Sequence, residues 1–105
     1  MEKPSSIPFG RTARLLAAEA RQRGLEAPGF RYPPRDATLQ RAIRRYPGGQ
    51  AVVSVRVRGR PFAEVVEDMV TGILIANGVV AASREGAKLR SDLMAAAAPM
   101  EAEAA

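Results

Sequence analysis

The sequence predicts a small single domain of the α+β class, and three observations carry this prediction. The 105 residues have ordinary globular composition, 47% hydrophobic and 26% charged, which leaves room for one modest core. Residues 53–58 alternate apolar and polar side chains with the period of a strand. Apolar stripes at helical spacing lie before and after that strand. We expect a flexible lead-in over residues 1–8, one basic domain over 9–98 and a disordered acidic tail over 99–105.

The first helix is predicted over residues 9–23. Phe9, Leu16 and Ala20 fall on one stripe of that segment, while its arginines lie elsewhere. Gly24 is a typical residue just beyond a helix end, and Leu25 then contacts Ala20 in a Schellman stop. The helix should therefore end at this glycine.

A proline-rich connector, residues 28–36, follows this helix. In it Phe30 and Tyr32 flank Arg31. Aromatic rings between arginines can stack on unpaired bases, so both rings are candidate stacking residues. The alternative, which we favour, is that both rings cover the small core.

Residues 36–46 fit two interpretations. As a helix capped by Asp36, the segment places Leu39, Ile43 and Tyr46 on one stripe. As a strand it would pair with residues 51–57, because Gly48-Gly49 before a strand is a hairpin signal. A two-residue loop would put Ile43 on the arginine face of the ribbon. A three- or five-residue loop would bring Ile43 to the valines but take Arg41 and Arg45 with it, so both interpretations stay open.

The remaining elements follow from clear local signals. The ribbon strand spans about 51–59 and ends at Gly59, and Pro61 suits the first turn of a long apolar helix over about 61–77. Ser83 is a plausible cap for a C-terminal helix that reaches residue 98, with Leu89 and Leu93 facing inward.

Charge is divided unequally along the chain. Residues 9–60 hold twelve arginines against three acidic residues, a net charge of +9, whereas residues 61–105 carry −4. A basic segment of this size is the electrostatic footprint of a polyanion-binding surface. The alternatives are a solvated basic face and an acidic protein partner. The arginine and alanine bias is also typical of a GC-rich bacterial genome.

Several functional classes lose their key residues. The chain has no cysteine and no histidine, which removes disulfides, thiolate zinc sites and Ser-His-Asp or Cys-His catalysis. Glu64 and Asp68 form a carboxylate pair without a third ligand or nucleophile near them in the sequence. We therefore expect no enzyme, cofactor, metal or small-molecule substrate. The longest uncharged run, residues 69–83, is shorter than the about 20 residues of a spanning helix, which favours a cytoplasmic protein without a membrane partner.

The order strand, helix, glycine turn and helix from Val52 onward resembles, loosely, the ribbon-helix-helix family of DNA-binding dimers. In that family the outward residues of a two-fold ribbon enter the major groove. The resemblance implies that Ser54, Arg56 and Arg58 would be those outward residues and that Ser83 would start the second helix.

Two functional hypotheses follow. The first is a small nucleic-acid-binding protein, for DNA more than RNA, which contacts phosphates through Arg41, Arg44, Arg45, Arg56, Arg58 and Arg60, with Ser54 beside them. The second is a non-enzymatic interaction module, either a homodimer or an assembly subunit built on helix 62–77. Its interface would comprise Val66, Met69, Gly72 and Ile73. Glycine inside a helix costs about 1 kcal/mol against alanine, so Gly72 suggests the close approach of another helix.

Overall fold

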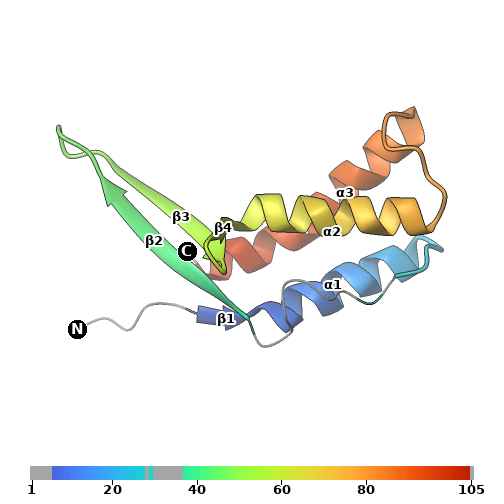
Figure 1. Ribbon diagram of the computed structural model, residues 1–105, viewed down its shortest axis with the longest axis horizontal. Coiled ribbons are helices and arrows are strands. Elements are labelled where there is room, and N and C mark those ends of the chain that lie inside the picture. The colour runs from blue at the N-terminus through green and yellow to red at the C-terminus, as the bar shows by residue number, and fades with distance from the viewer. Residues whose placement is uncertain (1–5, 28, 30–36, 105) are drawn as a thin grey trace.

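The computed structural model describes residues 6–27, 29 and 37–104. Its elements are, in order, β1 (Ser6–Pro8), α1 (Phe9–Gln22), β2 (Thr38–Arg45), β3 (Ala51–Val57), β4 (Arg60–Pro61), α2 (Phe62–Ala76) and α3 (Arg84–Ala104). The strands form one antiparallel sheet in the order β1-β2-β3-β4. The predicted α+β domain is confirmed. Figure 1 shows the three helices side by side and the β2–β3 hairpin extending away from one end of them.

The core lies between the helices and the base of the hairpin. α2 supplies seven of its buried side chains because its apolar residues recur at helical spacing. α3 packs against both α1 and α2, and its Leu93 and Ala97 are fully buried. The sheet closes one end of this core with Leu39, Val55 and Val57. Burial of each such side chain stabilises the fold by about 1.5–3 kcal/mol.

Three predicted helix boundaries are confirmed, namely the ends of α1 and α2 and the start of α3. Gly24 has a φ of 74°, and the Leu25 N–H donates to the Ala20 carbonyl at 2.9 Å, as in a Schellman stop. α2 ends in the same way, with Val79 N–H donating to the Leu74 carbonyl at 2.9 Å. At the start of α3, the Gly86 N–H donates to Ser83 Oγ at 3.0 Å, which makes Ser83 the predicted cap.

The side chain of Asn77 connects the C-terminal ends of α1 and α2. Its Nδ2 donates to the Glu26 carbonyl at 2.8 Å and to the Ile73 carbonyl at 2.7 Å. Its Oδ1 accepts the Glu26 N–H at 2.8 Å. One side chain thereby holds the chain after α1 against the last turn of α2.

Residues 38–45 form a strand, which decides between the two interpretations of that segment. Ile43 lies opposite Val53 and Arg45 opposite Ala51, so residues 46–50 make a five-residue connection. The Tyr46 N–H donates to the Gln50 carbonyl at 2.8 Å and closes the hairpin. As expected for this loop length, Arg41 and Arg45 share the face of the valines. That face accommodates arginines because the hairpin extends beyond the helices there and the side chains stay exposed.

The structure differs from the expectation at both ends of the domain. α3 continues to Ala104, although a disordered tail was predicted from residue 99. Proline disfavours a helix interior, but buried Ala97 and Met100 pack on the core and hold the last turns. Pro8 ends the short strand β1, which pairs with β2 where a flexible lead-in was predicted. Residues 1–5 and 105 lie outside the described residues.

One part of the hairpin projects from the body of the molecule. Residues 40–53, which we call the arm, are all exposed. The radius of gyration is 15.1 Å and the extents are 46 × 29 × 19 Å. A compact chain of this length would have a radius of gyration of about 13 Å. The arm contributes to this difference, because it spans about 17 Å over its five residue steps along β2.

Candidate nucleic-acid interface

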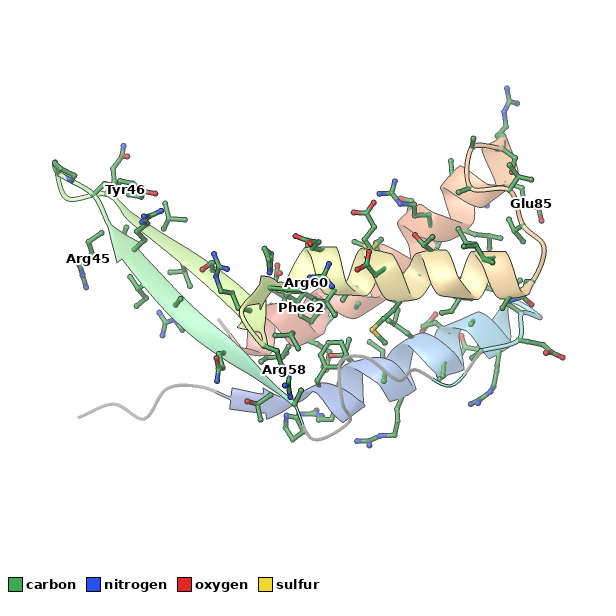
Figure 2. The ribbon with its side chains drawn as sticks, in the orientation of Figure 1. Arg45, Tyr46, Arg58, Arg60, Phe62 and Glu85 are labelled. Carbon is green, nitrogen blue, oxygen red and sulfur yellow. The ribbon has the colours of Figure 1, made fainter. Side chains whose placement is uncertain are left out.

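The arm combines positive charge with exposed apolar side chains. It carries Arg41, Arg44 and Arg45 and no acidic residue. Six large hydrophobic side chains are exposed in the described chain, and four of them lie on the arm: Ile43, Tyr46, Val52 and Val53. Figure 2 shows Arg45 and Tyr46 at the free end of the hairpin and Arg58 and Arg60 at its base. Exposed apolar residues gathered in one place typically mark an interaction surface.

The arginines are divided between the two faces of the ribbon. Alternation along the paired strands places Arg44, Ser54 and Arg56 on one face, which we call the outer face. The opposite, core-side face carries Arg41 and Arg45 and continues into the buried residues at the base. A ligand that surrounds the arm would therefore contact arginines on both faces of the ribbon.

The end of the outer face holds an arginine–aromatic pair. The guanidinium carbon of Arg44 lies 5.7 Å from the centre of the Tyr46 ring, a cation–π contact that orients both groups. Tyr46 is 44% exposed. Sequence analysis did not include Tyr46 among the site residues. The signal that could have found it is an aromatic residue directly after two arginines and before a Pro-Gly-Gly turn.

Arg56 and Arg58 belong to the base of the hairpin. Positive φ angles at Arg58 (50°) and Gly59 (82°) make the β3–β4 connection a type I′ turn. Arg56 Nη1 donates to the Gly59 carbonyl at 2.7 Å and braces this turn. Arg58 is exposed at the turn, apart from the arm. These two predicted phosphate ligands are thus separated from the three arginines of the arm.

Arg60 is engaged within the protein, in contrast to its predicted role as a phosphate ligand. Its Nη2 lies 2.6 Å from Glu64 Oε1 and 2.8 Å from Asp68 Oδ2. Hydrogen bonds to Glu64 and then Asp68 raise the pKa of the Arg60 guanidinium above its usual value. The cause is helical spacing, because Glu64 and Asp68 occupy successive turns of the helix that follows Arg60.

The described acidic residues of α2 and α3 form one further ion pair and no cluster that could hold a metal ion. Glu67 pairs with Arg90 across α2 and α3. Within residues 6–27, 29 and 37–104, no cluster of three or more His, Cys, Asp or Glu side chains has the arrangement to hold a metal ion.

The residues predicted as a protein interface on α2 are core residues. Val66, Met69 and Ile73 are at most 4% exposed. Gly72 is half-buried, and a Cβ added there would meet no described atom within 4 Å outside its own helix. α3 and the base of the sheet contact α2 directly, and α1 contributes buried residues to the same core. The candidate stacking residues Phe30 and Tyr32 lie outside the described residues.

No protein-family model matches the chain, and neither the curated proteins nor the solved structures contain a significant match to it. The resemblance to the ribbon-helix-helix family implied a ribbon shared between two chains, whereas all of β3 pairs with β2 of the same chain. No described helix has both the length and the apolar character needed to cross a membrane.

Proposed function

We propose that this protein binds nucleic acid by means of the arm. The observation that carries the proposal is the projection of Arg41, Arg44 and Arg45 on a ribbon that has no acidic residue. None of the three forms an ion pair with a carboxylate of the described chain. Phosphates supply the counter-charges that the arm itself lacks.

The shape of the arm favours duplex DNA. The major groove of B-form DNA is wide enough for a two-stranded ribbon. Inside that groove, Arg44 on the outer face and Arg41 and Arg45 on the core-side face are directed toward opposite phosphate walls. The major groove of A-form RNA is too narrow for side chains to read. This difference supports DNA as the preferred ligand.

In this proposed role the protein is a cytoplasmic binding protein that uses no catalytic residue, metal or cofactor. Electrostatic contacts account for most of the affinity, so binding should weaken steeply as salt rises.

The test is a salt titration of binding to a labelled DNA duplex, followed by fluorescence anisotropy. Replacement of Arg41, Arg44 and Arg45 by Gln should lower the slope of log affinity against log salt by about 2–3, because each lost phosphate contact removes about 0.9. A matched control replaces the exposed arginines Arg14, Arg21 and Arg84 by Gln, which removes the same charge from the helices.

The control should retain most of the affinity and slope. Equal losses in the two triple variants would show that net charge alone attracts DNA, and the arm would then have no special role. Absence of binding at low salt would also contradict the proposal. A duplex RNA of the same sequence should bind more weakly than the DNA.

A further inference from the structure

The outer edge of β3 is open along most of its length. β4 covers only Arg56 and Val57, and no described strand lies beside residues 51–55 on that side. The hydrogen bond from Tyr46 to Gln50 sets the alternation of the hairpin ladder. By that alternation, the N–H and C=O groups of Val53 and Val55 are directed away from β2. They are available to an additional strand.

The two open edges of the arm differ in charge. The free edge of β2, residues 41–45, carries three arginines, and charged residues are a common means of preventing strand addition. The free edge of β3, residues 51–55, reads AVVSV and has no charged residue. β-Branched valines in an uncharged segment favour pairing. The β3 edge is therefore the one suited to another strand.

A groove lies beside this edge. It has a volume of about 380 Å³ and is lined by Val53, Ser54, Val55, Pro61, Phe62, Ala63, Ala98, Glu101 and Ala102. Glu101 is the only charged residue of that lining. The groove extends from the open edge of β3 over the ends of α2 and α3 that adjoin the hairpin base.

We infer that a second copy of this chain occupies the edge, with its β3 antiparallel to the first. The segment is complementary to itself: a two-fold axis at Val53 places Ala51 opposite Val55, Val52 opposite Ser54, and Val53 opposite its symmetry mate. These are cross-strand pairs of the kind that stabilise sheets. The resulting arms form one sheet in the order β2-β3-β3-β2.

Charge complementarity supports the second copy as the occupant. In the four-stranded arrangement the two β2 strands are about 14 Å apart. That distance exceeds the screening length of about 8 Å at physiological salt, so their arginines repel each other weakly. Arg45 and Ala51 are neighbours in each hairpin, and the two-fold axis brings Ala51 of the second copy beside Val55. Arg45 of the second copy then lies on the same side of the sheet as Glu101 in the groove.

The test measures mass by light scattering over a range of protein concentrations, without nucleic acid. Val53→Pro removes an N–H that is directed away from β2, so the intrachain ladder is retained while the added strand loses a donor. We expect this variant to weaken dimerisation at least tenfold. Ile43→Pro is the matched control, because Ile43 lies directly across from Val53 and is 48% exposed against 44%. The Ile43 N–H also makes no hydrogen bond to the other strand of the hairpin, but it lies on the free edge of β2. The dimer of the Ile43→Pro variant should therefore persist.

A second pair of variants tests whether Arg45 of one copy pairs with Glu101 of the other in this arrangement. Glu101→Arg should weaken the dimer, and the combination of Arg45→Glu with Glu101→Arg should restore it. A wild-type protein that stays monomeric throughout, or equal effects of the two proline variants, overturns the inference. Circular dichroism confirms that each variant is folded. Because this measurement contains no nucleic acid, its outcome is independent of the proposed DNA binding.

Discussion

At the residue scale, two helical glycines have opposite surroundings. A Cβ added at Gly86 would lie 2.0 Å from the Val80 carbonyl oxygen, in the backbone that precedes α3. A Cβ added at Gly72 would meet nothing within 4 Å. The Val80 backbone lies so close to residue 86 that only glycine fits there, whereas the monomer has space for a side chain at residue 72.

The two positions predict opposite effects of alanine. Gly72→Ala should raise the free energy of unfolding by about 0.5–1 kcal/mol, since alanine has the higher helix propensity. Gly86→Ala should lower it by about 1–3 kcal/mol, the usual cost of overpacking. Urea unfolding followed by circular dichroism measures both. A destabilised Gly72→Ala would indicate that another chain packs closely on α2, contrary to our assignment of that helix to the core.

At the element scale, helix ends determine how the elements are joined. α1 and α2 both end in Schellman stops, and Asn77 bridges the chain that leaves them. At the other end of α2, Arg60 pairs with the first two turns of the helix and fixes the approach of the hairpin. At its base, β3 is therefore paired with β2 on one edge and with β4 on the other, and Arg60 of β4 connects this base to α2.

Removal of the Asn77 bridge tests this view of the helix ends. Asn77→Ala removes three hydrogen bonds and leaves the backbone N–H and C=O of Glu26 without their partner. The expected loss is about 1–2 kcal/mol of unfolding free energy, measured by urea titration. Ser91→Ala, at an exposed position on α3, is the control and should change stability by less than about 0.5 kcal/mol. An equal effect of the two variants would assign no role to the bridge.

At the scale of the whole molecule, the core and the proposed binding surface lie in different regions. The buried residues lie in the helices and at the base of the sheet, while every residue of the arm is exposed. The arm is basic, and residues 61–105 carry −4. The arm should accordingly be dispensable for folding.

Shortening the arm tests that separation. Deletion of residues 42–45 and 51–54 removes four residues from each strand, so the side-chain alternation and the five-residue connection are preserved. The shortened protein should change its unfolding free energy by about 1 kcal/mol or less, because it keeps the buried side chains. It should also lose both DNA binding and dimerisation. Loss of cooperative unfolding would show instead that the arm is required for the fold.

The sequence predicted those parts of the protein that depend on neighbouring residues. Ala20, Gly24 and Leu25 contain a complete helix stop, and the alternation of valines and arginines was sufficient to identify β3. For the candidate site, the sequence located the three arginines of the arm but also included Arg60. Its partners Glu64 and Asp68 were considered only as a carboxylate pair, because Arg60 falls in the basic segment 9–60 and both acids fall in the segment 61–105.

Contacts between distant residues decided the rest. Both interpretations of residues 36–46 satisfied local rules, and pairing of β2 with β3, which buries Leu39 opposite Val57, selected the strand. The apolar stripe of α2 was evident in the sequence, but only the packing of α1 and α3 showed that it is covered within the chain. The pairing register of β2 with β3 was likewise needed to assign each arginine to a face of the ribbon. It was also needed to distinguish the two free edges. By itself the sequence determined that α1, β3, α2 and the start of α3 are helical or extended and where α1 and α2 end, since these features depend on local sterics and hydrogen bonding. Tertiary structure decided which surfaces remain exposed, because burial depends on what the rest of the chain covers.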